Sequence, residues 1–140
     1  MPLVHLNIGS NKGDRLGYIN RAVALIASKA GKITAVSQPV ESDPWGYESD
    51  SRFINIGLNL DTTLQPALLL DLLQEIERTV SPDPHRNPDG SYRDRSIDID
   101  IIIYDGVEIS TPRLTLPHPR MHQRDFVKIP LRQIWNKPIR

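Results

Sequence analysis

The sequence predicts an α+β fold of the ferredoxin-like class, an antiparallel sheet covered by helices, with a hairpin and a helix added at the C-terminus. Apolar and polar residues alternate in short segments such as Phe53–Leu60, which is typical of strands. Two longer segments repeat apolar residues every three or four positions, which is typical of helices. The segments follow in the order β-α-β-β-α-β, and 140 residues suffice for one domain, residues 1–140, with its own core.

The first strand and the first helix occupy the start of the chain. Residues 3–8 alternate and predict a strand, which the following Gly-Ser-Asn interrupts. Residues 12–30 predict a helix, and Gly31 is suited to terminate it. The apolar positions of that helix recur at spacings of three and four: Ile19, Ala22, Val23 and Ile26.

The middle of the chain predicts two more strands and a second helix. Residues 33–40 and Phe53–Leu60 are strand candidates, separated by a polar loop over residues 42–51 that contains proline and glycine. Residues 63–79 predict a leucine-rich helix with Pro66 in its first turn. Proline is tolerated there because an N–H at that position has no acceptor within the helix.

The last third begins with a long polar loop, residues 81–94, which contains three prolines and one glycine. So long a loop in a compact domain is often a functional lid. A fourth strand over residues 97–104, a hairpin over residues 107–116 and a final helix over residues 124–135 follow. We expect Pro130 to kink or shorten that helix.

The fourth strand carries two carboxylates within a run of isoleucines. A period of two places Ile97, Ile99, Ile101 and Ile103 on one face, and Asp98, Asp100, Ile102 and Tyr104 on the other. The second half of the strand is apolar on both faces, which indicates a central, buried strand. The two aspartates have Cα atoms about 7 Å apart, and they repel each other unless a cation lies between them.

The chemistry around this pair points to phosphate. Carboxylates without histidine or cysteine close by in sequence supply hard oxygen ligands, which magnesium prefers together with water and substrate phosphates. Arginines flank the strand, and a guanidinium is shaped for bidentate phosphate recognition. We therefore expect a magnesium-dependent phosphoryl-transfer site. The basic residues before and after the strand are Arg86, Arg93, Arg95, Arg113, His118, Arg120 and Arg124.

Each signal also has an ordinary structural explanation. An Asp-x-Asp pair is often solvated or salt-bridged, arginines are common on surfaces, and His118 lies between two prolines as a turn residue does. A non-catalytic ferredoxin-like domain that binds RNA or a protein through its sheet remains the alternative. RNA binding favours exposed aromatic residues on a basic sheet, whereas these strands carry acids and aliphatic residues.

Composition narrows the classes of partner and location. Basic and acidic residues number 17 each, so no net charge favours nucleic acid or a membrane surface. The absence of cysteine excludes disulfides, thiolate-bound zinc and a cysteine nucleophile, and it fits a cytoplasmic protein. The first ten residues lack the pattern of a secretory signal, and no apolar run is long enough to span a bilayer. We expect a cytoplasmic monomer whose partners are small molecules.

Three motifs stand out in the chain: residues 53–55 (FIN), 94–103 (DRSIDIDIII) and 113–121 (RLTLPHPRM). The last two resemble the signatures, and the first resembles the third strand, of a known family, the 6-hydroxymethyl-7,8-dihydropterin pyrophosphokinases of folate biosynthesis. The likeness extends from residue 8 to residue 131. It implies an enzyme that moves diphosphate from ATP to the hydroxymethyl group of the reduced pterin and releases AMP.

The resemblance also implies roles around the acid pair. Asp98 and Asp100 match ligands of two magnesium ions that bridge the ATP phosphates, and such an ion lowers the pKa of an attacking hydroxyl. The implied catalytic residues, which contact phosphate, are Arg86, Arg95, His118 and Arg124. The implied ATP-binding residues are Gln74, Glu77, Ile101, Arg113 and Thr115, together with His118 and Arg124.

For the pterin, the resemblance implies a pocket built from strand and helix residues. Asn55 matches an amide that reads the polar edge of the ring, since an amide offers a paired donor and acceptor. Phe126 matches the aromatic residue that stacks on the ring, and Phe53 is either a second pocket aromatic or an ordinary core residue. Backbone contacts are implied for Ser42, Pro44 and Trp45.

Overall fold

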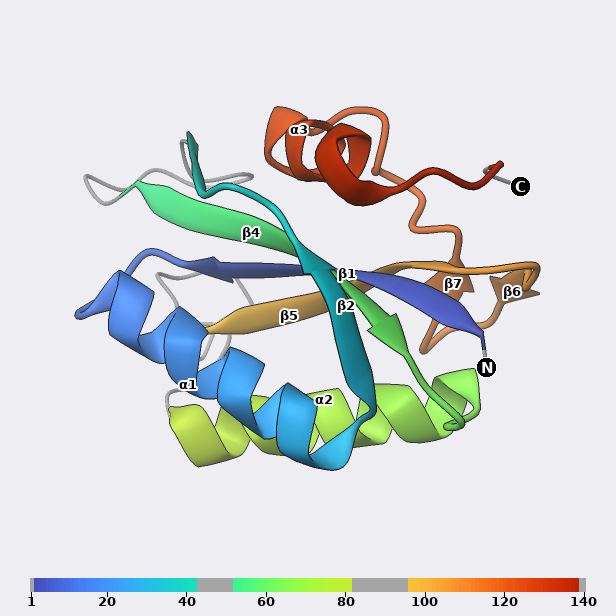
Figure 1. Cartoon of the computed structure of the whole chain (residues 1–140), viewed down its shortest axis with the longest axis horizontal. Coiled ribbons are helices and arrows are strands. Elements are labelled where there is room, and N and C mark those ends of the chain that lie inside the picture. The colour runs from blue at the N-terminus through green and yellow to red at the C-terminus, as the bar shows by residue number, and fades with distance from the viewer. Residues whose placement is uncertain (1, 43–51, 82–95, 139–140) are drawn as a thin grey trace.

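An antiparallel sheet lies between helices on both of its faces (Figure 1). The structure, a computed structural model, describes residues 2–42, 52–81 and 96–138. Neighbouring strands follow the order β2 (Lys32–Val36), β4 (Phe53–Asp61), β1 (Leu3–Ser10) and β5 (Asp98–Tyr104), and β3 (Val40–Ser42) also pairs with β4. All of these pairings are antiparallel, which confirms the predicted combination of helices with an antiparallel sheet.

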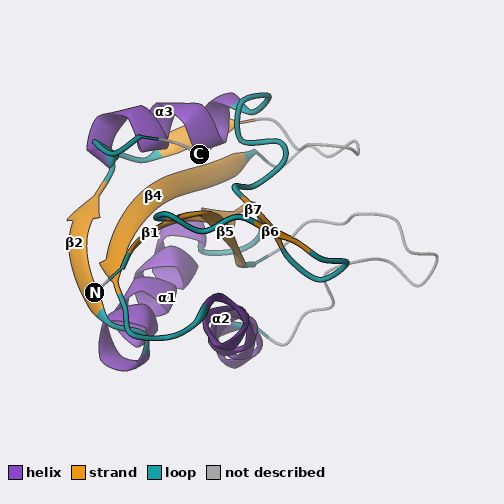
Figure 2. Cartoon of the chain, turned by 90° about the vertical axis from the view of Figure 1, so that its right-hand side faces the viewer, coloured by secondary structure: helices purple, strands orange, loops and turns teal. Residues whose placement is uncertain are grey.

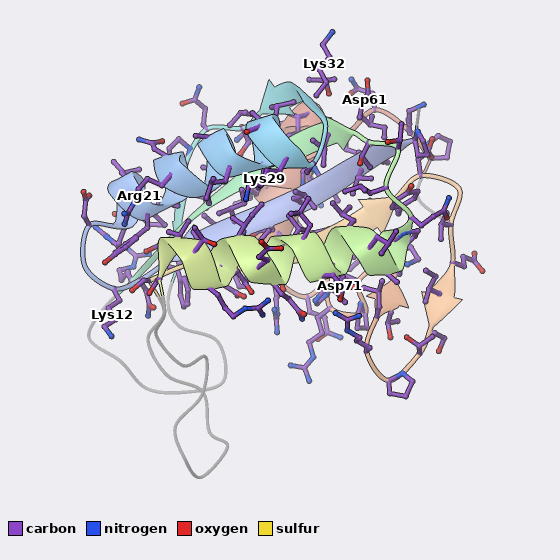
Figure 3. The ribbon with its side chains drawn as sticks, turned by 90° about the horizontal axis from the view of Figure 1, so that it is seen from below. Lys12, Arg21, Lys29, Lys32, Asp61 and Asp71 are labelled. Carbon is purple, nitrogen blue, oxygen red and sulfur yellow. The ribbon has the colours of Figure 1, made fainter. Side chains whose placement is uncertain are left out.

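Helices α1 (Arg15–Lys29) and α2 (Pro66–Val80) lie side by side on one face of the sheet (Figure 3). The alternation of β1 sends Val4, Leu6 and Ile8 into the core beneath them, and all three are fully buried. Burying a side chain of this size contributes roughly 1.5–3 kcal/mol. No helix in the described part of the chain is long and apolar enough to cross a membrane.

Helix α1 begins at Arg15 and not at residue 12 as predicted. Gly13 has φ +68°, a conformation that no helix continues and that glycine adopts without steric cost. Asp14 then caps the helix, because its Oδ1 accepts the N–H of Gly17 at 3.1 Å. The true start is thus set by a glycine turn and a carboxylate cap.

Helix α2 also begins later than predicted, at Pro66. The residues just before it are held by Thr62, whose hydroxyl donates to Ala30 O at 2.7 Å and accepts the N–H of Leu64 at 3.1 Å. This side chain ties the segment to the end of α1 and keeps it out of the helix.

The strand predicted over residues 33–40 is in fact two strands, β2 and β3. The chain leaves the sheet between them, since the N–H of Gln38 donates to Gln133 Oε1 at 2.8 Å and Pro39 has no N–H to donate. The predicted hairpin is confirmed, with β6 (Ile109–Ser110) paired to β7 (Thr115–Leu116).

Strand β5 carries a register shift that the predicted alternation missed. His5 pairs with Ile103 and Leu6 with Ile101, so Ile102 is an extra residue, a β-bulge. Up to Ile102 the predicted faces are correct. Beyond it they exchange, because Ile103 joins the cluster under α3 and Tyr104 joins the core under α1 and α2.

Helix α3 (Asp125–Ile134) covers the opposite face of the sheet (Figure 2). The predicted helix over residues 124–135 is confirmed to within one residue at each end. It runs through Pro130, so the expected shortening at this proline is wrong. Gly57 makes room for it, because a Cβ at residue 57 would lie 2.8 Å from Pro130 Cβ and 2.7 Å from His5 Cε1. The backbone acceptor that Pro130 leaves without its usual donor, Phe126 O, accepts Asn7 Nδ2 at 2.9 Å instead.

Candidate active site

A pocket of about 420 Å³ opens between α2, the outer edge of β5 and the β6–β7 hairpin. It brings together both carboxylates and most of the residues predicted for ATP. Those residues are Gln74, Glu77, Asp98, Asp100, Ile101, Arg113, Thr115 and His118. The remaining ATP-binding prediction, Arg124, lies on the α3 side.

The wall between α2 and β5 depends on a buried carboxylate. Glu77 is only 4% exposed, and its Oε2 accepts the N–H of Ile99 at 2.7 Å. Strand β5 lies at the edge of the described sheet and not at its centre as predicted. The N–H of Ile99 therefore points outward and needs such a partner. By the alternation of an antiparallel pair, Ile101 directs its backbone N–H and C=O toward the same edge and the pocket.

Arg113 links the hairpin side of the pocket to α2. Its Nη2 donates to Gln74 Oε1 at 3.0 Å and also forms an ion pair with Asp71. Asp71 projects from α2 (Figure 3) and was not among the predicted site residues. An acidic residue one turn from Gln74 was the available signal in the sequence.

His118 lines the pocket, and two hydrogen bonds orient it. Its backbone N–H donates to Ile102 O at 2.8 Å, and its Nδ1 accepts the N–H of Arg120 at 3.2 Å. Burial lowers the pKa of His118 below its usual value, the charges of Arg124 and Arg120 lower it further, and Asp98 opposes them. At neutral pH the ring is therefore uncharged and donates from Nε2.

Asp98 and Asp100 share one face of β5, and both are partly exposed in the pocket. Oxygen ligands from two carboxylates with room for phosphate and water fit a magnesium ion. Within the described residues no group of three or more histidine, cysteine, aspartate or glutamate side chains gathers to hold a metal. Magnesium is commonly held by one or two carboxylates, with water and substrate phosphates as its other ligands.

The residues predicted for the pterin meet on the other side of β1. Asn55 is 3% exposed, and its Nδ2 donates to Ser42 Oγ at 3.0 Å. Gly9 allows this arrangement, because a Cβ there would lie 2.5 Å from Asn55 Oδ1 and 3.3 Å from Phe53 Cδ1. Phe53 lies two residues before Asn55 on β4 and is half-buried.

The first turn of α3 carries another residue predicted for the pterin, Phe126, and Arg124 precedes that turn. Phe126 is half-buried, and the guanidinium carbon of Arg124 lies 5.5 Å from the centre of its ring. The charge of Arg124 also acts on His118. The start of α3 is therefore close enough to the pocket for Arg124 to act on His118.

Two rows across the sheet connect the two halves of the site. Asn55, Gly9 and Asp98 are opposite one another on β4, β1 and β5, and Gly57, Asn7 and Asp100 form the parallel row. Two strand spacings, roughly 10 Å, separate Asn55 from Asp98. The predicted residues Pro44, Trp45, Arg86 and Arg95 lie outside the described residues.

The chain matches the sequence model of the family described as 7,8-dihydro-6-hydroxymethylpterin-pyrophosphokinase (HPPK) over residues 5–136. It belongs to this family. Curated HPPK relatives include the 2-amino-4-hydroxy-6-hydroxymethyldihydropteridine pyrophosphokinase of Porphyromonas gingivalis, which is 38% identical over 141 residues, covering 99% of this chain and 95% of the relative. The enzyme of the same name from Bacillus subtilis is 38% identical over 133 residues, covering 94% of this chain and 77% of the relative.

Solved HPPK structures share the fold. The HPPK-DHPS protein of Plasmodium falciparum with SDX-DHP superposes with a TM-score of 0.73 over 96% of this chain, at 14% identity. This chain spans 40% of that longer protein. At so low an identity, the likeness concerns the fold alone.

Proposed function

We propose that this HPPK transfers the terminal diphosphate of ATP to the hydroxymethyl group of 6-hydroxymethyl-7,8-dihydropterin, giving AMP and the pterin diphosphate for folate biosynthesis. Family membership supports the reaction. One structural observation carries the assignment to this site: the row Asn55–Gly9–Asp98, with an amide at one end and a carboxylate beside an open pocket at the other. A ring held at Asn55 extends its substituent toward Asp98.

The nucleotide belongs in the pocket between α2 and the hairpin. The backbone edge at Ile101 and the hydroxyl of Thr115 offer hydrogen bonds to a base, and Arg113 offers a guanidinium to sugar or phosphate oxygens. His118, uncharged and oriented by Arg120, donates from Nε2 to a phosphate oxygen. Gln74 and Glu77 complete the α2 wall.

Asp98 and Asp100 would hold the magnesium ions, two in number. When bound, these ions neutralise the phosphate charge and make the pterin hydroxyl more acidic. The chain's own contribution is to place the two carboxylates where pocket and pterin side meet, and to exclude water with the first turn of α3. Phe126 stacks on the pterin ring, Phe53 lines it, and Arg124 contacts phosphate.

The remaining assignments belong to the same proposal. Arg86 and Arg95 as phosphate contacts, and Pro44 and Trp45 as pterin contacts, rest on the motifs that resemble the family. The strand order β2-β4-β1-β5 supports the ferredoxin-like classification. A monomeric, single-domain protein of the cytoplasm fits the composition and the small-molecule substrates.

The test is the identity of the nucleotide product. With magnesium, ATP and the dihydropterin present together, we expect AMP and pterin diphosphate in equal amounts, and no AMP when either substrate is left out. Formation of ADP would contradict the proposal, because it reports transfer of a single phosphoryl group.

A matched pair of variants tests the metal assignment. Asp98→Asn should keep the fold and lower turnover by at least roughly 100-fold, since an amide does not replace a charged ligand. Asp61→Asn is the control, because Asp61 pairs with Leu3 at the opposite end of β1 from Gly9. If both variants turn over at the rate of the unmodified protein, Asp98 holds no essential ion.

A further inference from the structure

Asn7 is a buried polar residue that none of the predicted roles uses. It lies on β1 and is 3% exposed, and its side chain crosses to α3, where Nδ2 donates to Phe126 O at 2.9 Å. The two residues are 119 positions apart in the chain. An apolar residue would be the ordinary choice for a central strand beneath a helix, so this amide calls for an explanation.

The contact answers a specific need of α3. In a regular helix Phe126 O accepts the N–H of residue 130, but Pro130 has none. Pro130 is buried against Gly57, so the helix face toward the sheet offers little water to take the place of that donor. Asn7 supplies the missing hydrogen bond from the sheet, and it thereby fixes the position of Phe126 relative to β1.

The fastened residue is the one proposed to stack on the pterin. Asn7 is also the direct cross-strand neighbour of Asp100, so a single side chain lies between a proposed magnesium ligand and the backbone of Phe126. Arg124 lies two residues before Phe126. Its guanidinium lies over the Phe126 ring, and its charge lowers the pKa of His118. A shift of this turn would therefore move the pterin side of the site relative to the carboxylates.

We propose that Asn7 is a positioning residue for the pterin. Its amide sets the distance between the first turn of α3, which carries Phe126, and the part of the sheet that carries Asp98 and Asp100. The inference rests on the proposed function and adds a residue to it. Asn7 does not touch substrate in this scheme and acts through Phe126.

The chain contains a matched control at the other end of the same helix. Asn59 is also 3% exposed and also donates to an α3 carbonyl, from Nδ2 to Ile134 O at 2.8 Å. It lies opposite His5, beyond Asn7 and away from Gly9. Asn59 is also hydrogen-bonded to His5, so the two positions are compared for substrate binding and not for stability. If both amides are merely structural, their loss should change substrate binding equally little.

The experiment compares Asn7→Ala and Asn59→Ala in the full chain. Pterin binding is measured by fluorescence titration with magnesium and an ATP analogue whose α,β-bridging oxygen is replaced by methylene, and analogue binding is measured by calorimetry. We expect Asn7→Ala to raise the pterin dissociation constant by about tenfold, because a displaced Phe126 would lose about 1.4 kcal/mol of its contact with the ring. Nucleotide binding should stay within about twofold of the unmodified protein, and Asn59→Ala should change neither constant by more than that.

Two further variants keep the test decisive if an alanine variant does not fold. Asn7→Ser leaves a polar group that can hold water in the vacated space, and it should weaken pterin binding in the same direction. Gln133→Ala removes another α3 contact, to the N–H of Gln38, at the exposed end of the helix and serves as the second control.

The outcomes separate this inference from the proposed function. Equal pterin affinity in the Asn7 and Asn59 variants, or equal weakening of nucleotide and pterin in the Asn7 variant, would overturn the positioning role while the unmodified protein still makes AMP. Failure of the unmodified protein to bind the pterin would overturn the proposed function, and the inference with it.

Discussion

Acid should destabilise this protein through His5, a histidine sealed between the sheet and α3. The ring is 0% exposed, and its Nδ1 lies 2.8 Å from Asn59 Oδ1. Because Asn59 Nδ2 donates to Ile134 O, its Oδ1 faces His5, and Nδ1 carries the proton. Nε2 is buried and has no hydrogen-bond partner among the described residues, so a second proton there would be an unpaired buried charge.

The size of the effect follows from the pKa of His5. Burial lowers it from 6.5 to about 4, although the hydrogen bond with Asn59 acts in the opposite direction. Above pH 6.5 neither the folded nor the unfolded chain protonates this ring, and its contribution to stability is complete. As the pH falls from 6.5 to about 4, His5 binds a proton in the unfolded chain but not in the folded chain. Each pH unit in this interval lowers the free energy of unfolding by about 1.4 kcal/mol. The free energy of unfolding should therefore fall by about 3 kcal/mol over that interval.

Urea unfolding at pH 7.5 and pH 4.0 measures this loss, with His5→Leu as the comparison. Leucine is close to histidine in volume and does not titrate, and the partner that Asn59 loses is lost equally at both pH values. The unmodified protein should lose about 3 kcal/mol more than the variant between the two conditions. Equal losses in both proteins would refute the assignment of this pH dependence to His5.

Three further variants test contacts around the site. Gly9→Ala should raise the pterin KM by roughly tenfold with little change for ATP, because its Cβ would displace Asn55 Oδ1 from 2.5 Å; an unchanged pterin KM would show that Asn55 does not read the ring. Glu77→Leu should lower the free energy of unfolding by roughly 1–3 kcal/mol, since it leaves the N–H of Ile99 without its acceptor, and a smaller loss in urea unfolding would mean that water replaces the carboxylate. His118→Gln should retain more turnover than His118→Ala, because the glutamine amide can donate from the position of Nε2; equal rates would exclude that hydrogen bond.

Local pattern predicted most of the fold and several of the residues that line the pocket beside β5. The spacing of Asp98 and Asp100, and the motif around His118, identified residues that do meet in one pocket. These residues are close in sequence, on one strand and the segment after it, so short-range pattern was enough. The Gly13–Asp14 turn also had a readable signal, a carboxylate cap, that would have given the start of α1.

What could not be predicted depends on which strands become neighbours. Asn7 and Gly9 acquire their roles only because β4 and β5 lie on either side of β1, and no local pattern states that pairing. A run of isoleucines likewise does not indicate that the β-bulge lies at Ile102. Local pattern also could not decide whether Pro130 would shorten α3, since the donor that compensates for this proline is a distant side chain.

The backbone edge at Ile101 has a consequence for how the enzyme could change under selection by an inhibitor. Its N–H and C=O face the pocket between two positions already engaged, Ile99 by Glu77 and Ile102 by His118. A substitution at residue 101 alters the shape of a side chain but removes neither main-chain group, unless it introduces proline. Few single substitutions could therefore make the protein resistant to a ligand that takes its hydrogen bonds from this edge. Those few would have to disrupt strand β5 itself.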